Sequence, residues 1–149
     1  MADIFSKQQR SAVMAAVRSK GNKATELKLI LILREHGIKG WRRQHRGVGK
    51  PDFVFPKYKL AIFVDGCFWH GCRRHFRMPQ ENRKYWKNKI LRNSQRDRAT
   101  TRFLRRGGWR VVRLWEHSLK DTNLVARKIK YELSTAEQLR KIHVQDHER

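Results

Sequence analysis

Residues 64–76, which read VDGCFWHGCRRHF, concentrate side chains that bind metal ions. Both cysteines of the chain, Cys67 and Cys72, lie in this segment, and His75 follows the second of them. Zinc ions in proteins prefer four sulfur or nitrogen ligands at the corners of a tetrahedron. The segment therefore supplies three candidate ligands for a structural zinc ion, which would hold a loop too short and too polar to form its own core.

The fourth zinc ligand must come from another part of the chain. His117 lies in the sequence LWEHSL, after a later predicted strand, and a loop there could close onto the first segment. His70 is a competing ligand, because it lies between the two cysteines. The alternative interpretation is a pair of buried free cysteines with unrelated histidines. Metal is favoured, because closely spaced Cys and His in a reducing compartment bind metal more often than they form disulfides.

Carboxylates at the ends of two predicted strands form a second candidate site. Asp52 opens the strand in KPDFVF, and Asp65 ends the next strand. If PKYK at 56–59 turns the chain so that these strands pair antiparallel, the two acids meet at one edge of the sheet. Glu26, at the start of a predicted helix, could reach the same edge. Three carboxylates amid positive charge can hold Mg²⁺, which would contact a phosphate and help to activate water. The alternative is a set of helix caps and surface salt bridges.

Large aromatic residues lie where a core role is least expected. Phe68 and Trp69 are inside the cysteine-containing loop, and Trp86 is near the start of a predicted basic helix. Side chains of this kind can wedge between base pairs and unstack a DNA duplex. The alternative is packing over the zinc loop, which is the commoner role for any one aromatic residue taken alone.

The charge of the chain indicates a polyanionic partner. Its 149 residues include 36 Lys and Arg against 13 Asp and Glu, a formal net charge of +23. Solubility needs a net charge of only about 2–8, and a larger excess repels itself in a compact fold. The basic residues are spread over several segments, which favours nucleic acid over a membrane surface. No stretch approaches the roughly 20 apolar residues of a membrane span, and we see no secretory signal, so we expect a cytoplasmic protein.

The elements that must position these residues are predicted from hydrophobic periodicity and turn residues. Helices are expected at 6–19, 25–36, 82–106 and 121–133, followed by a polar tail at 134–149 that is helical or frayed. Strands are expected at 41–46, 52–55, 60–64 and 109–115. The helical residues expected to pack inside are Leu27, Ile30, Leu31, Leu33, Trp86, Ile90, Phe103 and Leu104. A single α/β domain over 1–149, with a small mixed β-sheet flanked by helices on both faces, satisfies this order.

The same motifs occur together in a known family. GKPDFVF, IFVDGCFWHGCRRHF, YW before a basic helix, RD, and GGWRVVRLWEHSL follow one another in this order. Over most of its length, to about residue 133, the chain closely resembles the very-short-patch-repair (Vsr) mismatch endonuclease family. The resemblance implies a PD-(D/E)xK-type nuclease fold with an added structural Zn²⁺ ion. It also implies Mg²⁺-dependent nicking of one DNA strand beside a T·G mismatch, the product of 5-methylcytosine deamination.

The resemblance further implies roles for individual residues. Asp52 would be the central Mg²⁺ ligand, assisted by the backbone carbonyl of Val64; Asp65, where this chain departs from the family, is a further candidate ligand. Glu26 would organise water or the surrounding network, and His70 would act as general base or proton shuttle rather than as a zinc ligand. The implied zinc ligands are Cys67, Cys72, His75 and His117. The residues implied to enter the duplex next to the mismatch are Phe68, Trp69 and Trp86. The N-terminal helix, within residues 1–20, would lie along DNA.

The chain departs from the family pattern in three respects. Some members carry Thr-His where this chain has Val64-Asp65, so an aspartate stands where a histidine would donate a proton or contact a phosphate. The Lys of an ExK strand is absent after Asp65, and a zinc ligand that can be cysteine would here be His117.

Two rival functions remain open from the sequence. One is a homing or restriction-type DNA endonuclease without mismatch specificity, since such enzymes share the same kind of active site. The other is a non-catalytic, zinc-stabilised nucleic-acid-binding module, which leaves the acids at adjacent strand ends unexplained. For the main hypothesis the expected partner is double-stranded, mismatched DNA, with mismatch-repair accessory proteins as further candidates, and we expect a monomer.

Overall fold

The structure, a computed structural model, describes residue 8 and residues 24–43 and 49–147. The predicted helix at 6–19, and with it the DNA-contacting segment 1–20, lies almost wholly outside the described residues. Within the described ranges, no helix is both long enough and apolar enough to cross a membrane.

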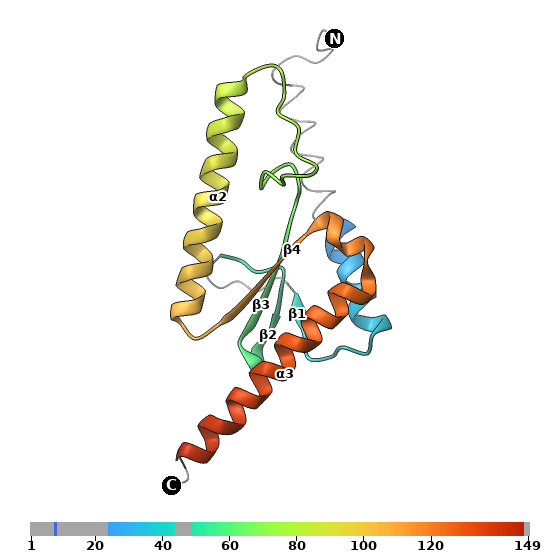
Figure 1. Ribbon diagram of the computed structural model, residues 1–149, viewed down its shortest axis with the longest axis vertical. Helices are drawn as coiled ribbons and strands as arrows, with labels where there is room; N and C mark the ends of the chain where they lie inside the picture. Colours follow the sequence, from blue (N-terminus) through green and yellow to red (C-terminus); the bar gives the residue numbers. More distant parts are fainter. Residues whose placement is uncertain (1–7, 9–23, 44–48, 148–149) are drawn as a thin grey trace.

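A mixed sheet of four strands forms the centre of the described molecule, in the order β1-β2-β3-β4. The strands are β1 (Arg42–Arg43), β2 (Phe53–Phe55), β3 (Leu60–Asp65) and β4 (Arg110–Trp115). Strand β2 pairs antiparallel with both β1 and β3, whereas β3 and β4 are parallel. The parallel pair requires a crossover, which is supplied by the long helix between them. The predicted mixed sheet is thus confirmed (Figure 1).

The hairpin between β2 and β3 decides where the acids meet. A short 3-10 helix, η1 (Pro56–Tyr58), reverses the chain, and Lys59 closes the turn with a left-handed backbone, φ 49°. Phe53 then pairs with Ile62 and Phe55 with Leu60. Extending this register places the start of β2 beside the end of β3, so Asp52 and Asp65 lie at the same end of the sheet, as predicted.

The two faces of the sheet bury different sets of side chains, because successive residues of a strand point to opposite faces. On one face, Val54, Ala61 and Phe63 form a small cluster with Leu104 of helix α2 (Arg83–Arg106). The opposite face carries the larger cluster of buried side chains. There, strand residues such as Ile62 and Leu114 pack with the helix at 24–35 and with α3 (Thr122–His147). Figure 1 shows α2 on one side of the sheet and the other two helices on the opposite side.

The prediction of which side chains are buried is partly wrong for the helix at 24–35 and for α2. Leu27 and Leu31 are exposed, at 47% and 57%, while Leu29 and Ile32 are fully buried instead. The buried face is therefore rotated from the one predicted, because it is the sheet and α3 that decide which side of the helix is covered. In α2, Trp86 and Leu104 are buried as expected, whereas Phe103 is 58% exposed.

The end of α2 and the start of α3 lie at residues that the sequence indicates. Helix α2 stops at Gly107, and Gly108 continues with φ 82°. The Leu124 N–H group donates to Asp121 Oδ1 at 3.0 Å, so Asp121 caps the first turn of α3. Helix α3 continues without a break through 134–147, and its last turns extend beyond the sheet (Figure 1).

Candidate active centre and metal site

Asp52 is a half-buried acid that immediately precedes β2. The Val64 N–H group donates to Asp52 Oδ2 at 2.8 Å, which links the two antiparallel strands. Burial raises the pKa of Asp52 to about 6; the Val64 hydrogen bond and Arg113 lower it, while the negative charges of Glu26 and Asp65 raise it further. A carboxylate that is costly to ionise and faces two other acids is suited to bind a cation. Asp52 is thus near enough to Glu26 and Asp65 for their charges to raise its pKa. Among the described residues, however, the acidic group whose ligand atoms all lie within 4.8 Å of one another is Asp65 with His70 and Asp97, and it includes neither Asp52 nor Glu26.

Glu26 approaches this centre from the helix at 24–35. Its Oε2 atom accepts a hydrogen bond from Arg43 Nη2 at 2.8 Å, and the side chain is 15% exposed. This contact ties the helix to the edge strand β1 and holds the carboxylate close enough to Asp52 to affect its pKa.

Asp65 faces the α2 side of the sheet and is only 8% exposed. Its Oδ1 atom accepts a hydrogen bond from Arg113 Nη1 at 2.9 Å and lies 3.9 Å from His70 Nδ1. Burial raises the pKa of Asp65, and Arg113 is the largest influence in the opposite direction, followed by His70. The Asp65 carboxylate thus lies between the Arg113 guanidinium group, to which it is hydrogen-bonded, and the imidazole of His70, the candidate general base.

His70 is held by the carboxylate of Asp97, a residue to which the sequence alone assigned no role. His70 Nδ1 and Asp97 Oδ2 form a short hydrogen bond. A carboxylate on one ring nitrogen orients the imidazole and leaves Nε2 for the substrate side. One signal could have identified Asp97: it is the only acidic residue in α2, a helix otherwise crowded with Lys and Arg.

Arg113 is a second residue that sequence reasoning missed. Its Nε atom donates to Thr101 Oγ1 at 2.9 Å, and Nη2 donates to the Asp97 carbonyl at 3.3 Å. The guanidinium group also lies 4.2 Å from the centre of the Phe63 ring. Through these contacts and its ion pair with Asp65, the Arg113 side chain of β4 connects α2 to the end of β3. An arginine between Val112 and Leu114 in a strand is the only local indication of this role.

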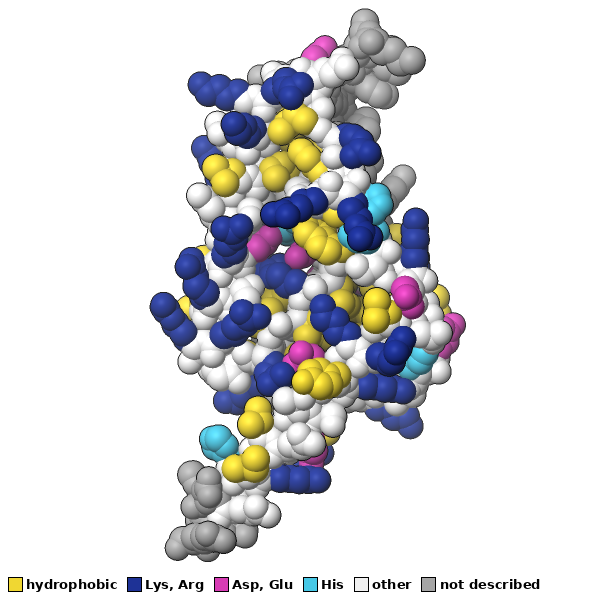
Figure 2. All heavy atoms as spheres, viewed as in Figure 1, with side chains coloured by type: hydrophobic (Ala, Val, Ile, Leu, Met, Phe, Trp, Pro, Cys, Tyr) yellow, Lys and Arg dark blue, Asp and Glu magenta, His cyan; other side chains and the backbone are white. Residues whose placement is uncertain are grey.

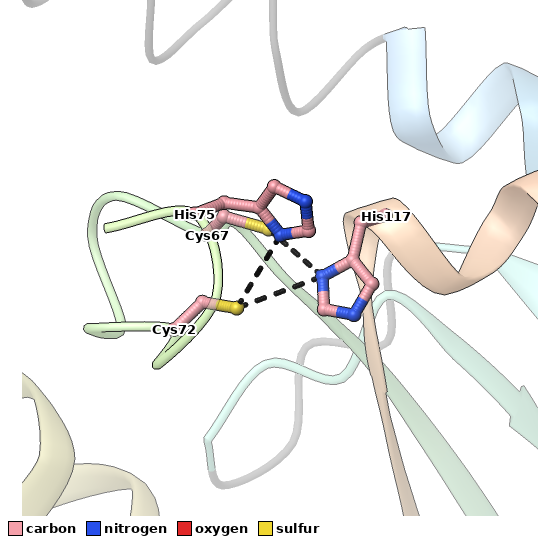
Figure 3. A group of neighbouring side chains, drawn as sticks. All are labelled: Cys67, Cys72, His75 and His117. Atoms are coloured by element: carbon pink, nitrogen blue, oxygen red, sulfur yellow. Dashed lines mark hydrogen bonds between the residues drawn. The ribbon is translucent and has the colours of Figure 1, made fainter. Parts of the chain in front are cut away.

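The four predicted zinc ligands meet at one point. Figure 3 shows the side chains of Cys67, Cys72, His75 and His117 converging from the 66–76 loop and from η2 (Glu116–Lys120). Their ligand atoms all lie within 4.8 Å of one another. The sequence alone left His70 as a competing ligand, whereas the structure turns His70 toward Asp97 and Asp65.

The separations between these atoms fit a tetrahedral zinc ion. Zn–S and Zn–N bonds of about 2.3 and 2.0 Å give tetrahedron edges between sulfur and nitrogen of about 3.5 Å. Cys67 Sγ lies 3.2 Å from His117 Nδ1, and Cys72 Sγ lies 3.6 Å from His117 Nδ1 and 3.7 Å from His75 Nδ1. Burial raises the pKa of the Cys67 thiol to about 11, so a thiolate there needs a cation. The residues present therefore fit a Zn²⁺ ion.

Groups around the cluster hold its ligands in place. Glu116 Oε1 accepts a hydrogen bond from the Cys67 N–H group at 2.9 Å, and the Trp115 ring stacks on His117. Partial burial lowers the pKa of His117, and the nearby His75 and Arg74 lower it further. A neutral imidazole keeps the lone pair that a metal ligand requires.

The predicted aromatic residues form one cluster beside the loop. Phe68, Trp69 and Trp86 have ring centroids 5.3–6.0 Å apart. Trp86 is only 7% exposed, so in this structure it packs under the other two rings rather than projecting outward. Asn93 Nδ2 donates to the Trp69 carbonyl at 2.8 Å, which ties the loop to α2 one turn before Asp97.

The surface around the centre is basic. Figure 2 shows a hollow beside α2 in which acidic side chains lie between Lys and Arg side chains on both sides. A cavity of about 440 Å³ lies here, between α2 and β4, with Asp65, His70 and Asp97 in its wall. A mixed sheet that carries clustered acids and a held imidazole beside a basic helix is typical of enzymes that cleave DNA.

Comparison with known proteins defines the family. Residues 2–75 match the family model described as DNA mismatch endonuclease Vsr. A type II nicking enzyme of Neisseria meningitidis serogroup C, V.NmeDIP, is 36% identical over 147 residues, 97% of this chain and 99% of the relative. The DNA mismatch endonuclease Vsr of Escherichia coli K12 is 37% identical over 122 residues, 80% of this chain and 77% of the relative. This chain belongs to the Vsr family of DNA endonucleases.

A further match is closer but shorter. The type II nicking enzyme V.NaeI of Lentzea aerocolonigenes is 53% identical over 68 residues, 46% of this chain and 41% of that relative. In that alignment the chain spans less than half of the relative's length, whereas the Neisseria match extends over nearly all of both chains.

Proposed function

We propose that this chain is a Mg²⁺-dependent endonuclease that nicks one strand of duplex DNA beside a T·G mismatch. The observation that carries the proposal is the His70 imidazole, held at Nδ1 by Asp97, with Asp65 3.9 Å away and the half-buried Asp52 just before the neighbouring strand β2. This arrangement gives a general base next to acids that favour a cation. A module that only binds DNA has no use for either group.

The acids and the imidazole have separate tasks in the proposed reaction. Asp52, Asp65 and the Val64 carbonyl would hold Mg²⁺, and Glu26 would orient water near Asp52. When bound, Mg²⁺ neutralises charge on the scissile phosphate and lowers the pKa of a bound water. His70 would take the proton of the attacking water at Nε2, and Asp97 would stabilise the resulting imidazolium. In-line attack then leaves a 5′-phosphate and a 3′-hydroxyl.

The remaining predicted residues would position the substrate. A Zn²⁺ ion on Cys67, Cys72, His75 and His117 would hold the loop that carries His70. Phe68 and Trp69 would enter the duplex where a mismatched step opens most cheaply, and Trp86 would follow from beneath them. We also retain the PD-(D/E)xK-type fold, the single domain over 1–149 and a cytoplasmic monomer as predictions.

A nicking assay on two matched duplexes tests the function. A duplex with one T·G pair and the same duplex with T·A in its place are labelled on each strand and incubated with the protein and Mg²⁺. We expect one nick in the T·G duplex, little in the T·A duplex, and none with Asp52→Ala, which should still bind DNA. Wild-type cleavage by Asp52→Ala would show that the acid cluster is not the active centre.

A second function is favoured by the names of the relatives. Several are called type II nicking enzymes, including the one aligned over 97% of this chain. Equal nicking of both duplexes at one sequence would select a nicking endonuclease without mismatch specificity.

A further inference from the structure

The cavity between α2 and β4 extends the active centre in one direction. Three of its wall residues, Asp65, His70 and Asp97, belong to the centre already described. The other residues that line it are Ser94, Arg98, Thr101, Arg102, Arg105, Arg113 and Trp115. Asp52, immediately before β2, is not among the residues that line this cavity. A scissile phosphate at the cleavage centre would lie against Asp65 and His70, which leaves the rest of the cavity to a neighbouring part of the same DNA strand.

Three arginines of α2 face this cavity. Arg98, Arg102 and Arg105 are spaced by four and three residues, which places them on one side of a helix. All three are exposed, and none of them makes an ion pair with a carboxylate among the described residues. Positive charges arranged in this way repel one another unless an anion lies between them.

Arg113 has a different role from these three residues. Its guanidinium group is already engaged by Asp65, by Thr101 Oγ1 and by the Asp97 carbonyl. Because Thr101 Oγ1 accepts the hydrogen bond from Arg113, its own hydroxyl proton is available to an anion in the cavity. Apart from Asp65, His70 and Asp97, the wall therefore presents fixed donors and three uncommitted cations, and this part of it suits an anion rather than a metal ion or an apolar ligand.

We propose that this arginine-lined cavity is a second phosphate subsite, which binds a non-scissile phosphate of the strand being cut. At 1.5 Å per residue, Arg98 and Arg105 are about 10 Å apart along α2. Phosphates of one strand advance about 3.4 Å each along the axis of duplex DNA. The arginine row thus spans on the order of three nucleotides, starting one residue after Asp97. The inference rests on the proposed function, because it takes the acids and His70 as the cleavage centre.

Two experiments test the subsite, and the first does not require cleavage. Binding of a labelled T·A duplex is measured over a range of salt concentrations for the wild type and for Arg102→Gln/Arg105→Gln. The control, Arg127→Gln/Lys128→Gln, removes the same charge from exposed positions on α3. We expect the slope of log K against log salt to fall by about 1 per arginine for the cavity variant. Equal slopes for the cavity variant and the wild type, or equal losses in cavity variant and control, would overturn the subsite.

The second experiment locates the phosphate. Single neutral methylphosphonates replace each of the three phosphates on either side of the nick, in the duplex that the wild type cuts. If the subsite binds one of them, that substitution slows wild-type nicking at least tenfold, but slows Arg102→Gln/Arg105→Gln much less. Independent, multiplicative effects at every position would overturn the subsite. Failure of the proposed function would instead appear as no nicking of any duplex by the wild type.

Discussion

Replacing Asp52 by Asn is expected to stabilise the protein while abolishing cleavage. The pKa of Asp52 rises from its usual 3.8 to about 6, chiefly because of burial. The native state therefore favours the protonated acid, so the contribution of Asp52 to stability is greatest below pH 4 and is lost as the pH rises through 6. At about 1.36 kcal/mol per pKa unit, ionising this group costs about 3 kcal/mol, and partial solvent screening reduces this to about 2 kcal/mol. Asn keeps an oxygen for the Val64 N–H group but carries no charge.

Thermal unfolding in Mg²⁺-free buffer measures this effect. At pH 8 the melting temperature of Asp52→Asn should exceed that of the wild type by about 4–8 °C, and the difference should vanish near pH 4. Added Mg²⁺ should raise the melting temperature of the wild type only, because binding to the native state stabilises it. Glu35→Gln, at an exposed acid of the 24–35 helix, is the matched control and should change little. A less stable Asp52→Asn protein at pH 8 would refute the reasoning that burial strains this carboxylate.

Three further perturbations test the rest of the centre. Arg113→Leu should lower the free energy of unfolding, measured by denaturant titration, by about 3 kcal/mol, because it removes the arginine that pairs with the buried Asp65. The double variant Arg113→Leu/Asp65→Asn should recover part of this loss. A double variant no more stable than Arg113→Leu would contradict the prediction. Asp97→Asn should reduce the single-turnover nicking rate about 100-fold with little change in DNA affinity, since it removes the partner of His70; unchanged rates would exclude Asp97 from catalysis. Cys72→Ala should lose bound zinc, measured by metal analysis of the purified protein, and unfold at lower temperature, whereas an equally stable, zinc-free wild type would argue against a structural ion.

Local patterns were sufficient for the elements that lie near one another in sequence. The turn at 56–59 predicts the β2–β3 hairpin, and antiparallel pairing through that turn is enough to place Asp52 and Asp65 at the same end of the sheet. The glycines at 107 and 108 mark the end of α2. The hairpin and the end of this helix depend on steric contacts and hydrogen bonds between residues that are close in the chain. A stretch of a few residues is therefore enough to predict them.

The sequence by itself also identified the chemistry: sulfur and imidazole ligands at unusual density, and acids at strand ends in a basic chain. The tertiary structure decided which groups act together. It paired His70 with Asp97, joined Arg113 to Asp65, and turned Leu31 outward. Each of these outcomes depends on how α2 and the 24–35 helix cover opposite faces of the sheet. Such packing joins residues far apart in the chain, where no local pattern specifies the partner.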